Sequence, residues 1–195
     1  MRPQKDPPKY GSPLIFLHWL MLVLIVAAYA CIELRGLYPR GSAIREGLKT
    51  WHYMLGLAIF ALVWLRLLAR FLARVPAIVP RPPQWQMLVA HVTEFAIYVF
   101  MILMPLLGWL ILSGENQTVP FFGLHLPALI GDNKVLAKQF EDIHGTIGDA
   151  GYFLIGLHAA AALIHHYIYR DNTLVRMLPS RSAKSKDAGR PTGHV

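Results

Sequence analysis

Cysteine and charged side chains are both scarce in this chain of 195 residues. Cys31 is the single cysteine, which excludes an intramolecular disulfide and a CxxC redox motif. Charged residues make up 15% of the chain, and polar low-complexity sequence appears only at the two ends. Hydrophobic residues make up 55%, above the norm for a soluble globular protein, and there is no internal repeat. The composition therefore indicates a membrane protein with one domain.

Four apolar runs are long enough to cross the hydrocarbon core of a bilayer, which needs about 20 residues. They cover approximately residues 13–32, 51–71, 87–112 and 143–169. Backbone groups without hydrogen bonds are too costly in hydrocarbon, so each run is predicted to be helical. The first run is too long for a cleaved signal core, although AAYAC before Ile32 faintly resembles a lipoprotein cleavage site. We predict an all-α membrane domain over residues 1–179, with a disordered polar tail at 180–195 that includes His194.

Lys and Arg are distributed unevenly between the two sides of these helices. Thirteen lie in the N-terminal tail, the second connection and its flanks, and the C-terminal tail, against six on the other side. The positive-inside rule therefore predicts that both termini lie in the cytoplasm. We interpret the net charge of +8 as charge that orients the protein in the membrane, and not as a sign of nucleic-acid binding. The six outward cations either attract an anionic substrate or are solvated loop charges. They are Arg35, Arg40, Arg45, Lys49, Lys134 and Lys138.

Nine histidines stand among few polar residues, and four of them occupy the apolar runs at two depths. His18 lies near the inner end of the first run, whereas His52 and His144 open the second and fourth runs near the outer face. His158 follows His144 by 14 residues, which places it about 21 Å deeper and within about 40° of the same helix face. The sequence therefore predicts that His52 pairs with His144 outside and that His18 pairs with His158 inside.

Two histidine pairs at two depths suit two b-type haems stacked across a membrane. Each such haem needs a neutral imidazole on either side of its iron, and facing helices of a bundle supply them. Small residues near the histidines would let a porphyrin approach the backbone; they are Gly56, Gly145, Gly148, Gly151, Gly156 and the alanines at 159–162. Taken singly, His18 and His52 also suit polar interfacial anchors, and the small residues also suit helix packing. His158 lies in mid-membrane, where an ionisable group indicates function.

Two segments resemble the bacterial cytochrome b561 family. GYFLIGLHAAAALIHHYIYRDNTLVRMLP (Gly151–Pro179) is similar to its fourth helix and the following segment, and FLHWLMLVLIVAAYACIELRGLYPR (Phe16–Arg40) to its first helix. The resemblance covers about residues 10–180. It implies a four-transmembrane-helix bundle of the bacterial inner membrane that encloses two b haems. The implied axial ligands of the haem iron are the same four residues, His18, His52, His144 and His158.

The motifs LVRMLP and ELRG favour the superoxide-oxidase branch of this family. The resemblance then implies a superoxide:quinone oxidoreductase, which takes electrons from superoxide at the outer face and passes them to ubiquinone. The third connection, SGENQTVPFFGLHLPALIGDN, is more similar to the general family than to that branch. The wider family includes haem-bearing membrane anchors, which pass electrons between a hydrogenase- or dehydrogenase-like partner and quinone. That role remains an alternative.

The remaining polar residues of the inner side have more than one interpretation. His165 follows His158 by seven residues on the same helix face, and the resemblance implies that it donates a hydrogen bond to a quinone oxygen. An interfacial anchor also explains His165, as it does His166. His91 and Glu94 begin the third helix, where they could contact a haem propionate, move quinone protons or be solvated.

A third function from a different class also fits the histidines. A His-lined transporter for a metal or a proton would need no haem, so it predicts a colourless protein. An optical spectrum separates this hypothesis from the two cytochromes, and co-purification of a partner separates an anchor subunit from an oxidase. His125, a lone histidine of the third connection, supports none of the three.

Overall fold

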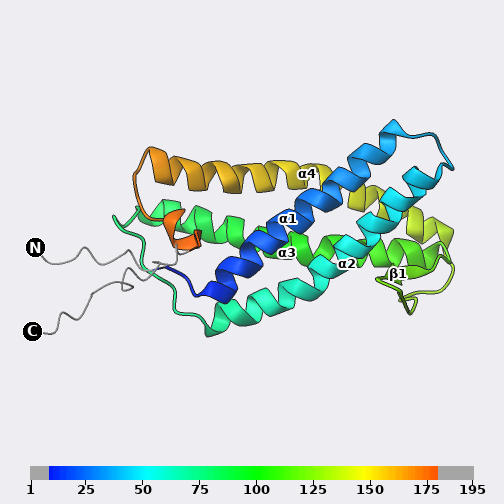
Figure 1. Ribbon diagram of the computed structural model, residues 1–195, viewed down its shortest axis with the longest axis horizontal. Helices are drawn as coiled ribbons and strands as arrows, with labels where there is room; N and C mark the ends of the chain where they lie inside the picture. Colours follow the sequence, from blue (N-terminus) through cyan, green and yellow to red (C-terminus); the bar gives the residue numbers. More distant parts are fainter. Residues whose placement is uncertain (1–8, 180–195) are drawn as a thin grey trace, which may run out of the picture.

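The computed structural model describes residues 9–179, and four long helices make up most of them (Figure 1). They are α1 (Ser12–Leu34), α2 (Ala43–Leu72), α3 (Gln84–Gly114) and α4 (Lys134–Tyr167). The short 3-10 helices η1 (Arg35–Leu37) and η2 (Val175–Met177) follow α1 and α4, and β1 (Val119–Phe121) pairs antiparallel with β2 (Leu124–Leu126). The predicted tail at 180–195, with His194, and residues 1–8 lie outside the described range.

Each long helix is apolar enough to cross a membrane, which confirms the predicted four-helix membrane bundle. Large apolar side chains cover the outside of the bundle; Phe71 and Phe153, for example, expose 83% and 82% of their surface. Apolar surface of this extent is unfavourable in water but favourable against lipid tails. The bundle is therefore built to stand in a bilayer.

Helices α2 and α4 begin earlier than their apolar runs. Helix α2 starts at Ala43 rather than near residue 51, and α4 starts at Lys134 rather than near residue 143. The side chains of Ser42 and Asn133 cap the two helices by accepting backbone N–H groups of the first turn. A hydropathy profile does not detect these first turns, because their residues are polar. The two histidines predicted to open the helices therefore lie well inside them.

The bundle has two distinct ends (Figure 1). The start of α1, the Pro-rich residues 73–83 and η2 gather at one end, which we call the terminal end. The η1 segment and the β1–β2 hairpin lie at the other, which we call the hairpin end. Residues 73–83 form no helix or strand, and the β1–β2 hairpin was not predicted from the sequence. Its turn places Phe122 and Gly123 at φ 46° and 87°, the positive values that tight hairpin turns require.

The apolar core occupies the middle of the bundle, where α1 packs on α2, α2 on α3 and α3 on α4. It consists of Met21, Ala28, Ile59, Val63, Phe100 and Met101. Gly151 of α4 fits closely against it, because a Cβ atom there would collide with the Tyr29 hydroxyl and the Phe100 ring. Gly151 stands midway between His144 and His158 in the sequence. A tightly packed layer therefore separates the two levels at which the histidines lie.

Candidate functional site

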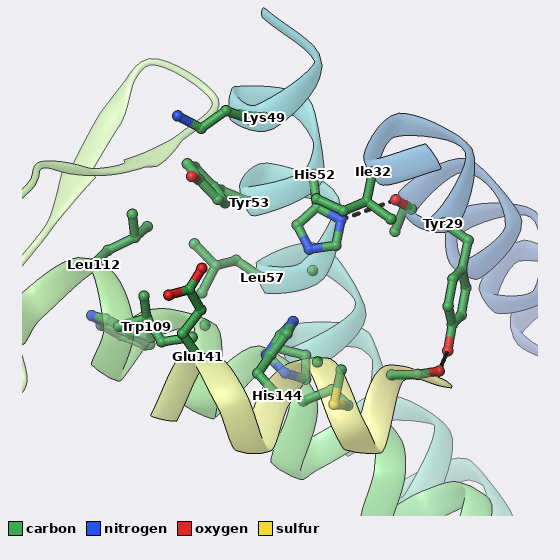
Figure 2. A pocket seen from close by; sticks show the side chains of 18 of the residues that line it. Tyr29, Ile32, Lys49, His52, Tyr53, Leu57, Trp109, Leu112, Glu141 and His144 are labelled. Atoms are coloured by element: carbon green, nitrogen blue, oxygen red, sulfur yellow. Dashed lines mark hydrogen bonds between the residues drawn. The ribbon is translucent and has the colours of Figure 1, made fainter. Parts of the chain in front are cut away.

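His52 of α2 and His144 of α4 approach each other near the hairpin end, with ring centres 6.2 Å apart (Figure 2). We call them the hairpin-end pair. Nδ1 of His52 donates a hydrogen bond to the carbonyl oxygen of Ala28 at 2.9 Å, which leaves its Nε2 as the free nitrogen. Nδ1 of His144 is buried and has no hydrogen-bond partner within residues 9–179. An imidazole held through Nδ1 in this way, as His52 is, is the usual form of a metal ligand.

The hairpin-end pair lines a cavity of about 700 Å³, within the range of cofactor and ligand sites. Gly56 and Gly145 widen the cavity beside the two rings, since a Cβ atom at either position would meet no atom within 4 Å. Tyr53, Trp109 and Leu112 line it on the side toward the hairpin (Figure 2). The cavity therefore offers two imidazoles within a mainly apolar lining.

His18 of α1 and His158 of α4 form a second pair, the terminal-end pair, with ring centres 6.3 Å apart. Helix α4 is open around His158: this imidazole and the alanines at 159–161 are exposed, and a Cβ atom at Gly156 would meet no atom within 4 Å. An imidazole exposed at membrane depth is unfavourable against lipid tails. This face of α4 is therefore suited to a ligand that lies along it.

The terminal-end pair differs from the hairpin-end pair in its polar neighbour. Nη2 of Arg66 donates to Nδ1 of His18 at 3.1 Å. In the sequence, Arg66 is only one of the thirteen charges that orient the protein in the membrane. In the structure its guanidinium lies beside His18. The available signal was an arginine inside the apolar stretch LVWLRLL, because an ionisable residue in such a stretch points to function.

Three of the six outward cations are engaged by neighbouring groups. Lys49 pairs with Glu46 at 2.9 Å, Lys138 pairs with Glu141 at 2.9 Å and Asp142 at 3.0 Å, and Arg45 donates to the carbonyls of Arg35 and Tyr38. Exposed pairs of this kind contribute little to stability, but they reduce the positive charge available to a substrate. Arg35, Lys49 and Lys138 all belong to the lining of the 700 Å³ cavity.

Comparison with known proteins identifies the family of this chain. The sequence model described as prokaryotic cytochrome b561 matches residues 9–180. The chain belongs to the prokaryotic cytochrome b561 family. This cytochrome is therefore a bacterial membrane protein that binds b-type haem and transfers electrons, as the resemblance predicted.

Curated relatives support the same assignment along nearly their whole length. The cytochrome is 36% identical to cytochrome b561 homolog 1 of Escherichia coli (strain K12) over 173 residues, which are 89% of this chain and 98% of that protein. It is 39% identical to the probable superoxide oxidase CybB of Yersinia pestis over 173 residues, 89% of this chain and 97% of that protein. Identity to cytochrome b561 homolog 2 of Escherichia coli is 25% over 182 residues, 91% of this chain and 95% of that protein.

Both histidine pairs of the cytochrome fit the geometry of haem ligation. A metal ion about 2 Å from each of two facing imidazole nitrogens sets the ring centres about 6 Å apart. The observed separations are 6.2 and 6.3 Å. The open space beside Gly56, Gly145 and Gly156 also suits a porphyrin that lies close to the helix backbone. The residues present therefore fit b-type haem.

His165 lies near the end of α4, where Asp171 holds it. Nδ1 of His165 and Oδ2 of Asp171 are 2.5 Å apart. Burial acts to raise the pKa of Asp171, but the hydrogen bonds from His165 and Thr173 outweigh it and hold this pKa below its ordinary value. Asp171 is therefore an ionised acceptor, and His165 donates to it through Nδ1. Nε2 of His165 remains available to another group.

The other polar residues singled out in the sequence fall into separate places. His91 and Glu94 line a second cavity of about 390 Å³ at the terminal end, together with Arg70, Arg81 and Arg176. Glu94 is paired there with Arg70 at 3.3 Å. His166 has a buried Nδ1 without a partner in the described part of the chain, and His125 is exposed on β2. His91 and Glu94 thus share one site, while His125 lies apart from every histidine pair.

Proposed function

We propose that this cytochrome is a superoxide oxidase that transfers electrons from superoxide to ubiquinone. In this proposal the hairpin-end pair and the terminal-end pair each hold one b haem. The observation that carries the proposal is the 39% identity to a probable superoxide oxidase over 97% of that protein. The two equally spaced histidine pairs support a relay across the bundle.

We further propose that the hairpin end faces the outside of the inner membrane and the terminal end faces the cytoplasm. The excess of Lys and Arg on the side of both termini supports this orientation. The 700 Å³ cavity of the hairpin-end pair then opens toward the compartment in which superoxide would arrive. The helical residues 43–50 and 134–142 lie on the same side.

Electron entry needs no bond between superoxide and the iron. A haem held by His52 and His144 would supply outer-sphere one-electron chemistry, because the two imidazoles would leave the iron no free position for superoxide. Arg35 in the cavity lining attracts the superoxide anion toward the hairpin-end pair. Two superoxide ions each lose one electron and leave as O2, and one ubiquinone takes up the two electrons with two protons to become ubiquinol.

Electron exit uses the terminal end, where His165 serves the quinone. Its Nδ1 is held by Asp171, so the ring is fixed in orientation and Nε2 is free to face a quinone oxygen. In its doubly protonated form the same ring would donate to the quinone through Nε2. The dyad therefore orients the quinone and delivers protons from the cytoplasmic side.

The test is superoxide-driven quinone reduction by the purified protein. We expect one ubiquinol for every two superoxide ions consumed, and no such activity in His52→Ala. An absorbance spectrum without haem bands would instead support a transporter. Haems that stay oxidised in superoxide, but are reduced by a co-purifying dehydrogenase, would replace the oxidase by an anchor subunit.

A further inference from the structure

Arg66 is a positive charge inside the bundle without a negative partner. It lies in an apolar part of α2, fewer than two turns before the helix ends at Leu72. Its Nη1 is buried and has no hydrogen-bond partner within residues 9–179, and none of the ion pairs of those residues includes Arg66. A partly buried guanidinium at membrane depth without a counterion is destabilising, so the site is suited to an anion.

Tyr98 of α3 adds a second unpaired donor at the same place. Its hydroxyl is buried and has no partner among the described residues, and its ring centre lies 6.0 Å from the guanidinium carbon of Arg66. The carboxylate one turn earlier on α3, Glu94, is already paired with Arg70. The guanidinium of Arg66 and the hydroxyl of Tyr98 are therefore two donors on different helices, and these neighbouring side chains supply no acceptor for them.

Loading of haem would release Arg66 from its present contact. Arg66 now donates to Nδ1 of His18, which requires a lone pair on that nitrogen. If iron binds Nε2 of His18, Nδ1 carries the proton of the neutral ring and no longer accepts. If iron binds Nδ1, it takes the lone pair itself. In either case the guanidinium loses its acceptor and needs another one within reach.

We propose that Arg66 and Tyr98 bind a propionate carboxylate of the haem held by His18 and His158. A guanidinium matches a carboxylate with two parallel N–H groups, and a tyrosine hydroxyl donates a third hydrogen bond. The two imidazoles fix the position of the iron but leave the porphyrin free to rotate about the line between them. The propionate contact fixes this rotation. The inference rests on the proposed haem site of the terminal-end pair and is independent of superoxide as the donor.

The experiment compares Arg66→Gln, Arg66→Lys and Tyr98→Phe with the unmodified full-length holoprotein. Resonance Raman spectra follow the propionate bending mode, and redox titration follows the midpoint potential of each haem. In Arg66→Gln we expect the propionate mode of the terminal-end haem to shift to lower frequency as its hydrogen bonds are lost. Its midpoint potential should fall, because a nearby cation disfavours the ferric state. Tyr98→Phe should shift the mode in the same direction by less.

Arg66→Lys retains the charge but not the two parallel N–H groups, so it should shift the mode while largely preserving the potential. Arg70→Gln is the matched control, since Arg70 lies one turn further along α2 and is paired with Glu94. It should leave the propionate mode unchanged. If Arg66→Gln does not accumulate, Arg66→Lys and Tyr98→Phe carry the same test.

Two results would overturn the inference. An unchanged propionate mode in Arg66→Gln with a lowered potential would mean that Arg66 acts on His18 alone. A shift confined to the hairpin-end haem would place the propionate contact elsewhere. Failure of the underlying haem site looks different, because His18→Ala would then retain every haem of the unmodified protein.

Discussion

The hairpin-end pair and the terminal-end pair have nearly the same spacing, but one histidine of each pair has a different polar neighbour at Nδ1. At the hairpin end a carbonyl oxygen accepts the Nδ1 proton of His52, whereas at the terminal end a guanidinium approaches Nδ1 of His18. An acceptor makes an imidazole a stronger electron donor to iron and lowers the haem potential, while a cation raises it. The helices thus set the geometry of each pair, and the neighbouring groups set the direction in which we expect electrons to move.

Replacing single histidines tests the pairing with the largest expected effect. His52→Ala and His144→Ala should each remove the same haem, about half of the total, because each iron would lose one of its two ligands. His18→Ala and His158→Ala should remove the other. Haem-to-protein ratios and redox difference spectra of the four variants check this. Loss of different haems from His52→Ala and His144→Ala would show that these two histidines do not hold the same haem.

His165→Ala tests the exit from the terminal-end pair. We expect both haems and their reduction by superoxide to persist, while reoxidation by quinone slows on the order of 100-fold, a typical effect of removing a general acid. Stopped-flow absorbance separates the two half-reactions. His166→Ala is the matched control and should leave reoxidation unchanged. Haem loss in His165→Ala would make His165 a ligand, and unchanged turnover would move the quinone to the cavity of His91 and Glu94.

Gly151 tests the packed layer between the two pairs. Gly151→Ala should destabilise the protein by about 1–3 kcal/mol, because the new methyl group meets the Tyr29 hydroxyl and the Phe100 ring. Gly47→Ala in α2 meets no atom within 4 Å and should gain up to about 1 kcal/mol from helix propensity. Thermal unfolding in detergent measures both. Equal melting temperatures would show that the layer yields more easily than its contacts indicate.

Charge reversal at the cavity tests the entrance to the hairpin-end pair and has the smallest expected effect. Arg35→Glu should slow the reaction with superoxide by a factor of about three, and Lys138→Glu by less, because Lys138 is already neutralised by Glu141 and Asp142. Both differences should vanish near 1 M salt, where the Debye length is about 3 Å. Rates that do not change with ionic strength would exclude charge steering.

The sequence predicted the parts of this molecule that depend on regular periodicity. Apolar runs of membrane length predicted all four helices, and the spacing of 14 residues placed His144 and His158 on one face of α4. Opposite depths of His18 and His52 then predicted which residues approach each other, and the structure brings both pairs within 6.3 Å between ring centres. Their role as ligands stays a prediction until haem is measured in the variants.

Other features of the structure could not be predicted from such patterns. The polar first turns of α2 and α4 depend on the caps Ser42 and Asn133, which a hydropathy window does not weigh. The hairpin turn at Phe122 and Gly123 lacks the usual Asn-Gly signal. The position of Arg66 beside His18 depends on how α1 and α2 cross. The pairing of Lys138 depends on carboxylates that lie one turn away along α4.

The segment after α4 also links parts of the chain that are made at different times. Asn172 exchanges backbone and side-chain hydrogen bonds with Val79 and Ala77, Arg176 donates to the carbonyl of Pro76, and Trp19 donates to the carbonyl of Met177. These contacts form only after the ribosome has completed residues 171–177. The terminal end of the bundle is therefore closed last, so a nascent chain keeps this end open until the whole four-helix unit has been synthesised.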